Sequence, residues 1–312
     1  MNDNAVGQQS SLPLEEAVCA LLEAIAPGSM LSAIHPIEGD FANDAYMVKA
    51  HSATGSGMRI VIKSYVECGQ ERSEKARLEF RTLEWLQDHS VPAPTPLYLD
   101  KSGALLGAPS IVTSCVPGKH IIVPSNPPSD PLNWARAMAV MLAKIHSVPC
   151  NAEAQSLLLD ANSEALWFLH PGVMPDYMNA YLDGAEVWQL IHDLLPDIQQ
   201  VQPTLVHLDY WPGNVLWDQG QITGVIDWEE AAYGDPAIDL AYCRMDMFIS
   251  GMEQAADELV LAYEAEIGRR VANLAFWELA ATPRPMHDPA WGPSVRQELG
   301  RFITNARRRI DH

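Results

Sequence analysis

Apolar residues recur at helical spacing in several parts of the chain. The first such stretch opens at Ser11-Leu12-Pro13 and carries one apolar stripe from Leu14 to Ile25, where Pro27-Gly28 ends it. Residues 72–89 return to helical spacing, and the proline-rich segment 91–94 stops them. Further helices are expected at 134–145, 175–182, 186–194, 236–248, 252–267 and 294–308.

Strand-like segments occupy two places in the chain. Short apolar runs joined by turn-forming residues predict strands at 32–37, 45–50, 59–65, 97–99 and 109–115. A second β-rich segment, 204–227, interrupts the helical region, and the densest cluster of turn formers lies at 124–131. An α+β arrangement follows, with a tail and helix at 1–30, a sheet lobe with one long helix at 31–123, and a mainly helical lobe at 124–312.

Polar side chains gather around a predicted hairpin in the segment 204–227. Val215-Leu-Trp217 and Ile222–Ile226 form its strands, with a turn at 218–221, so Asn214 and Asp227 fall at the same open end. An amide oxygen beside a carboxylate suits Mg²⁺, which prefers hard oxygen ligands. Asp209, in the loop that leads into the hairpin, can accept a proton from a hydroxyl that attacks a metal-bound phosphate.

A second constellation is expected in the first lobe. Lys63 ends the apolar run of the strand at 59–65, and Glu79 falls inside the apolar stripe of the following helix. A carboxylate on an apolar face is expensive unless it has a partner, and Lys63 is the natural one. Such a lysine–glutamate pair is what a kinase places behind the phosphates of ATP.

The spacing His207-x-Asp209-x-x-x-x-Asn214, followed by an apolar strand and Asp227, is the catalytic pattern of protein kinases. With its flanks, VHLDYWPGNVLW and GVIDWEEAAYGDPAIDLA, the chain resembles the aminoglycoside phosphotransferase (phosphotransferase enzyme) family from about Ile34 to Arg308. Leu208 replaces the glycine that is usual in that family.

The resemblance implies a bilobal protein-kinase-like fold and a set of roles. Asp209 would be the catalytic base, Asn214 and Asp227 would hold Mg²⁺, and His207 would buttress the loop. The segment Ser114–Val116 would be the hinge that meets the adenine of ATP, and the loop 38–44, with its single glycine, would cover the phosphates. Asp239 matches a residue whose role in the family is structural.

The net charge of the chain limits the classes of partner that it is expected to bind. The formal net charge is −20, which argues against nucleic acid and against an anionic membrane surface. Residues 125–243 hold 16 acidic and two basic residues, and residues 145–243 contain no lysine or arginine. The arginines at 307–309 are expected to be exposed at a helix end.

The five cysteines have no metal-binding spacing and are expected as free thiols. No secretory signal or apolar run long enough to span a bilayer is present in the sequence, which predicts a cytoplasmic protein.

The sequence therefore predicts an ATP- and Mg²⁺-dependent kinase of a small-molecule hydroxyl, monomeric by default. The acidic second lobe favours a cationic acceptor such as an aminoglycoside. Other acceptors in the family, among them choline, homoserine and macrolides, stay open. A non-catalytic nucleotide-binding protein and a metallohydrolase built on His207 and Asp209 are the alternatives from other classes.

Overall fold

The computed structural model describes residues 14–37, 43–66, 72–121, 126–181, 183–287 and 293–310. These residues form two compact units, the first made of the described residues up to Asp88 with Ala93–Val116, and the second of His89–Pro92 with the described residues from Pro117 onward. The first unit ends before the boundary expected at 123/124 because Lys119 and His120 pair with a strand of the second unit. Three predicted features lie partly or wholly outside the described residues. They are positions 38–42 of the expected phosphate-covering loop, Cys68, and positions 124–125 of the turn cluster.

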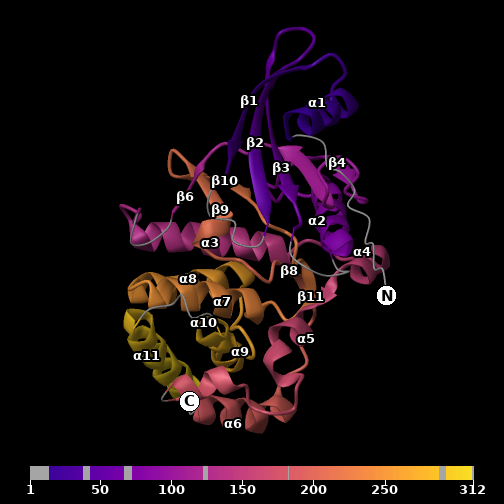
Figure 1. The fold of residues 1–312 in the computed structure, drawn as a ribbon. Helices are drawn as coiled ribbons and strands as arrows, with labels where there is room; N and C mark the ends of the chain where they lie inside the picture. Colours follow the sequence, from indigo (N-terminus) through magenta and orange to yellow (C-terminus); the bar gives the residue numbers. More distant parts are fainter. Residues whose placement is uncertain are drawn as a thin grey trace, which may run out of the picture. The chain divides into compact units, whose positions relative to one another are not determined.

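The first unit is a five-stranded sheet with two helices. The strand order is β1-β2-β3-β5-β4, and every pairing is antiparallel (Figure 1). The elements are α1 (Leu14–Ile25), β1 (Met30–Pro36), β2 (Asp44–His51), β3 (Gly57–Ser64), α2 (Arg72–Leu86), β4 (Pro96–Asp100) and β5 (Ser110–Ser114).

The two faces of this sheet have different roles. Ile60 and Ile62 of β3 point to one face, where they form an apolar core with the buried stripe of α1, including Val18 and Leu21. The side chain of Lys63 points to the opposite face, because successive residues of a strand alternate. There it meets α2. Helix α1, expected from the sequence as a separate N-terminal segment, is thus part of the first unit's core.

The second unit is mainly helical. Helix α8 packs against α3 on one side and α7 on the other, and α9 packs against α7 and α11 (Figure 1). The helices are α3 (Pro131–His146), α4 (Ala152–Leu157), α5 (Ala161–Ala165), α6 (Gly184–Leu194), α7 (Ala237–Ile249), α8 (Glu253–Ile267), α9 (Leu274–Ala281), α10 (Pro283–His287) and α11 (Pro293–Ile310), with short 3₁₀ turns η1 (Trp167–Leu169), η2 (Asp176–Ala180), η3 (Leu195–Asp197) and η4 (Pro212–Asn214).

The second unit also contains two small sheets of three strands each. One has the order β10-β9-β6 and the other β7-β11-β8. Their strands are β6 (Lys119–His120), β7 (Leu159–Asp160), β8 (Thr204–Val206), β9 (Val215–Asp218), β10 (Gln221–Val225) and β11 (Ala232–Gly234). The predicted hairpin is confirmed as β9 and β10, with Val215 opposite Val225.

The sequence missed or misjudged several elements. The helix expected at 175–182 is only the 3₁₀ turn η2, and α9 was not anticipated. Almost every residue of α9 is buried, so apart from Glu278 apolar residues lie on all of its faces and the sequence shows no helical period. Arg309, expected to be exposed, donates a hydrogen bond to Glu278 of α9 instead.

A buried ion pair joins these helices. Arg244 of α7 and Glu278 of α9 have fully buried side chains and lie 3.1 Å apart. The guanidinium of Arg244 also donates to Asp257 of α8, at 2.7 Å, and to Asn305 of α11, at 3.0 Å. One cation therefore connects four helices.

Within the ranges given above, none of the helices has the length and apolar character that crossing a membrane requires. The cysteines in the same ranges, Cys19, Cys115, Cys150 and Cys243, are free thiols.

Replacing Arg244 with glutamine is expected to lower the free energy of unfolding by about 3–5 kcal/mol, because Glu278 would keep its buried charge without its main partner. Urea denaturation followed by circular dichroism measures this loss. Arg270→Gln is the matched control, since Arg270 pairs with Glu264 at the surface and its side chain is 85% exposed. Equal losses in the two variants would contradict the structural role assigned to Arg244.

Candidate active site

The loop that follows β8 is anchored by one buried carboxylate. Asp239, in the first turn of α7, accepts the backbone N–H groups of His207 and Leu208 through its two oxygens, each at 2.7 Å. His146 of α3 lies 3.2 Å from the same carboxylate and 2.6 Å from the hydroxyl of Tyr263. Asp239 is fully buried, so these contacts also satisfy its charge. The structural role expected for Asp239 is the one that the geometry gives it.

The anchored backbone turns sharply at Leu208. This residue has φ 67°, in the left-handed region that residues with a Cβ rarely adopt. The conformation costs roughly 1–2 kcal/mol for a residue other than glycine. Its side chain is buried, and its carbonyl accepts a hydrogen bond from Arg284 at 3.3 Å. The surrounding contacts hold the turn in place, and the next side chain, that of Asp209, extends from it.

Asp209 has a partner at each carboxylate oxygen. Asn214 donates its amide N–H to Oδ2 at 2.8 Å and to the backbone carbonyl of Asp209 at 2.9 Å. Arg284 lies 3.2 Å from Oδ1. The Asp209 side chain is 30% exposed, so a small molecule can reach it. The contacts orient the carboxylate and leave lone pairs on both oxygens.

The hairpin end brings Asn214 and Asp227 together as the sequence predicted. The backbone N–H of Ile226 donates to the carbonyl of Asn214 at 2.9 Å, which ties the residue before β9 to the residue before Asp227. Because the amide nitrogen of Asn214 donates twice to Asp209, its side-chain oxygen faces elsewhere. An amide oxygen and the half-buried carboxylate of Asp227 are donors that fit Mg²⁺.

The His207 side chain holds the loop after β8 through contacts with Ile226 and Trp228. Its Nε2 lies 2.9 Å from the carbonyl of Ile226 and therefore carries the proton, while Nδ1 has no hydrogen-bond partner among the described residues. The ring packs on Trp228, with centroids 4.5 Å apart. His207 thus links the loop to the residue that follows β10.

The turn η4 between Asp209 and Asn214 depends on a close contact. A Cβ at Gly213 would lie 2.3 Å from ring atoms of Trp211, so only glycine fits there without movement. The carbonyl of Gly213 also lies 2.5 Å from Nδ1 of His120 in β6. The position of Asn214 therefore depends on the close approach of the Trp211 ring to Gly213 and on the contact of Gly213 with His120 of β6.

Arg284 of α10 is the site residue that the sequence did not indicate. Besides Asp209 it contacts the ring of Tyr242, with the guanidinium carbon 4.5 Å from the ring centroid. Burial alone would lower the pKa of Arg284, but Asp209, Tyr242, Glu230 and Asp246 together raise it. The one available signal was a single arginine between two prolines, Pro283 and Pro285, after a long apolar stretch.

The same helix face that carries Asp239 carries a second carboxylate. Asp246 lies two turns along α7, and burial raises its pKa to about 7 against the opposing effect of Arg284. Burial also raises the pKa of Tyr242 to about 12. Around Arg284 the second unit therefore presents a mixed cluster in which carboxylates outnumber cations.

In the first unit the predicted ion pair is confirmed. Lys63 Nζ lies 3.1 Å from Glu79 Oε2, and the two side chains are only 10% and 6% exposed. The hydroxyl of Tyr65 donates to the same carboxylate oxygen, and the ring of Tyr65 lies 5.3 Å from Lys63 Nζ. The pair is thus fixed by a strand, a helix and a phenol within one unit.

The predicted hinge lies where β5 ends. Ser114 donates its backbone N–H to Thr95 at 2.8 Å, and Cys115 donates to Arg59 at 3.2 Å. The backbone N–H groups of these two residues therefore already make hydrogen bonds within the first unit. Val116, the third residue of the expected hinge, is the last residue of the first unit.

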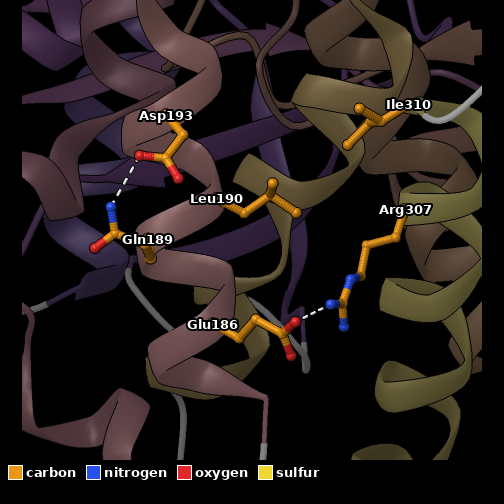
Figure 2. Close-up of a pocket in the computed structure, with 6 residues that line it drawn as sticks. All are labelled: Glu186, Gln189, Leu190, Asp193, Arg307 and Ile310. Atoms are coloured by element: carbon orange, nitrogen blue, oxygen red, sulfur yellow. Dashed lines mark hydrogen bonds and ion pairs between the residues drawn. The ribbon is translucent and has the colours of Figure 1, made fainter.

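A separate pocket lies between α6 and α11 and contains none of these residues (Figure 2). Glu186 of α6 and Arg307 of α11 form an ion pair across it, and Gln189 donates to Asp193 at 2.9 Å. Both carboxylates that line this pocket, Glu186 and Asp193, are paired with neighbouring side chains, and none of the predicted site residues lines it, so we do not take it as the candidate active site.

Comparison with known proteins gives a consistent result. A sequence model described as the phosphotransferase enzyme family matches residues 33–276. Acyl-CoA dehydrogenase family member 10 of Mus musculus is 28% identical over 186 residues, which cover 55% of this chain and 17% of that protein. Hygromycin-B 4-O-kinase of Escherichia coli is 54% identical over 61 residues, which cover 19% of this chain and 18% of that protein.

The solved structure of a choline kinase from Streptococcus pneumoniae superimposes with a TM-score of 0.64 at 16% identity, covering 95% of this chain and 99% of that one. At this identity the match shows a shared protein-kinase-like fold. The chain spans less than a fifth of the length of the two curated relatives described above.

Replacing Gly213 with alanine is expected to lower the free energy of unfolding by about 1–3 kcal/mol, because the new methyl group would overlap the ring of Trp211. Thermal unfolding measures the change. Gly57→Ala is the matched control, since a Cβ there meets nothing within 4 Å. Unchanged stability in the Gly213 variant would mean that the indole does not hold the turn.

Proposed function

Because the chain belongs to the phosphotransferase enzyme family, we propose that it is a kinase that transfers the γ-phosphate of ATP to a hydroxyl group of a small molecule, with Mg²⁺ as cofactor. The observation that carries the proposal is the oriented carboxylate of Asp209, held by Asn214 at 2.8 Å on the loop that leads to Asp227. A base beside two oxygen donors for a metal ion is the arrangement that phosphoryl transfer to a hydroxyl requires.

In the proposed reaction the hydroxyl oxygen of the acceptor attacks the γ-phosphorus of ATP while Asp209 accepts the hydroxyl proton. The bond between the γ-phosphorus and the β–γ bridging oxygen breaks, and ADP leaves. Hydrogen bonds from Asn214 and Arg284 hold the carboxylate in one orientation, so the lone pairs that would take the proton have a fixed direction. His207 keeps the loop against the end of β10. Asn214 and Asp227 would hold Mg²⁺, which when bound neutralises charge on the phosphate oxygens.

The first unit supplies the proposed nucleotide-binding groups. Lys63, oriented by Glu79, would donate to the phosphates of ATP, and the backbone around Val116, with Ser114 behind it in the sheet, would meet the adenine. The low exposure of the ion pair supports this role, since an ammonium with a fixed partner in a poorly hydrated place binds phosphate more strongly than a surface lysine does.

The acceptor is proposed to carry a positive charge. Glu230 and Asp246 act electrostatically on Arg284 next to Asp209, and residues 145–243 contain no lysine or arginine. Such a surface concentrates cations by its field. Amino sugars, amino alcohols and amine-bearing macrolides fit this description.

A coupled ATPase assay over a panel of amino sugars, macrolides, amino alcohols and neutral sugars tests the proposal. Slow ATP hydrolysis with Mg²⁺ alone, stimulated by one class of acceptor and abolished by a chelator, is the expected result. Affinity for the acceptor should fall as ionic strength rises if its charge contributes. ATP binding without turnover for every acceptor would instead favour a non-catalytic nucleotide-binding protein.

Asp209→Asn is expected to lower kcat for acceptor phosphorylation by about 10²–10⁴-fold, because the amide cannot accept the proton. Steady-state kinetics with the best acceptor measures it. Asp218→Asn is the matched control, an identical change at the exposed opposite end of β9. Turnover that survives the Asp209 substitution would show that another group is the base.

Lys63→Met is expected to weaken the use of ATP about 10- to 100-fold in kcat/KM, from the loss of one charge-assisted hydrogen bond to phosphate. Lys49→Met is the control, since Lys49 is exposed on the neighbouring strand β2. Melting temperatures of both variants should be recorded, because Glu79 loses its partner in the first. Unchanged kinetics for ATP would exclude Lys63 from nucleotide binding.

A further inference from the structure

One guanidinium group spans the peptide bond that precedes the proposed base. Arg284 Nη1 donates to the carbonyl of Leu208 at 3.3 Å, and Nη2 lies 3.2 Å from Oδ1 of Asp209. The carbonyl on one side of this peptide and the carboxylate on the other are thus fixed relative to each other by a rigid, planar group.

The peptide bond between Leu208 and Asp209 needs this support because of the backbone conformation of Leu208. Leu208 adopts φ 67°, a conformation that favours a residue without a Cβ. Relaxation of Leu208 toward negative φ would rotate the peptide that follows and move the Asp209 side chain. Asp239 holds the N–H of Leu208 at 2.7 Å, which fixes only one side of the residue. The other side is held by Arg284.

The position of Arg284 is constrained by its own surroundings. It lies in α10 between Pro283 and Pro285, both buried, and its guanidinium stacks over the ring of Tyr242 at 4.5 Å. A fixed backbone and a stacked head group leave the side chain little freedom to lose when it makes its two contacts. The contacts with Leu208 and Asp209 are therefore made entirely within the second unit.

We propose that Arg284 is a positioning residue that holds Asp209 in place by compensating for the left-handed conformation of Leu208. The proposal rests on the function proposed above in so far as Asp209 is the base. It predicts a specific dependence: Arg284 matters because residue 208 carries a Cβ, and it matters much less when residue 208 is glycine.

The test measures the effect of Arg284→Gln in three backgrounds. In the parent protein the substitution is expected to lower kcat about tenfold with the KM for ATP unchanged, since misplacing a catalytic group slows the chemical step. In the Leu208→Gly background the same substitution is expected to lower kcat less than about threefold. Leu208→Ala is the matched background: it also removes the buried leucine side chain but keeps the Cβ, so the tenfold effect should persist.

Two further variants sharpen the kinetic result. Arg284→Lys should behave like Arg284→Gln, because one ammonium group cannot reproduce two contacts made by a rigid fork. Arg136→Gln, which removes an exposed pair between α3 and α8, should leave kcat unchanged. An equal effect of Arg284→Gln in all three backgrounds, or full turnover of Arg284→Lys, would overturn the proposal.

Hydrogen exchange of the backbone supplies a readout that needs no activity. Peptides that cover residues 205–217 should exchange faster in Arg284→Gln than in the parent, and the Leu208→Gly background should remove most of that difference. Unchanged exchange in Arg284→Gln would overturn the proposal even if the protein had no kinase activity. Failure of the proposed function alone would leave the exchange pattern as predicted and abolish turnover in the parent protein.

Discussion

The candidate site depends on the buried carboxylate of Asp239. Its two oxygens accept hydrogen bonds from the backbone N–H groups of His207 and Leu208, which ties the loop after β8 to α7. Two successive backbone N–H groups buried away from water would otherwise be costly, so the loop and the helix stabilise each other. His146, with Tyr263 behind it, extends the same network into α3 and α8. The orientation of Asp209 is thus set by the packing of three helices and not by its own loop alone.

Two ion pairs of opposite charge lie in the interior of the two units. Lys63 and Glu79 in the first unit, and Arg244 and Glu278 in the second, are ion pairs of low exposure. The first pair is proposed to contact phosphate, and the second joins four helices. In both pairs the opposite charge offsets part of the cost of removing each group from water. A net charge of −20 is compatible with the proposed binding of a polyanionic nucleotide, since a local cation such as Lys63 would offset the phosphate charge.

Leu208 shows how a sequence departure becomes interpretable once the backbone is known. Read from the sequence, it is only a leucine where relatives usually have glycine. In the structure it occupies the left-handed conformation, with both of its backbone polar groups held by charged side chains. Strain at a site of this kind is retained only where surrounding contacts over-determine it, and Arg284 is one of those contacts.

The sequence alone determined the parts that depend on short-range pattern. The β9–β10 hairpin, the juxtaposition of Asn214 with Asp227, and the pairing of Lys63 with Glu79 all follow from strand alternation, helical spacing and the cost of a lone buried charge. Tertiary structure decided the rest. Arg284 reaches Asp209 across 75 positions of sequence. Helix α9 has no period because it is buried on every side, and Arg309 turns inward to a glutamate of that helix. Such contacts arise from the packing of distant segments, which no local pattern records.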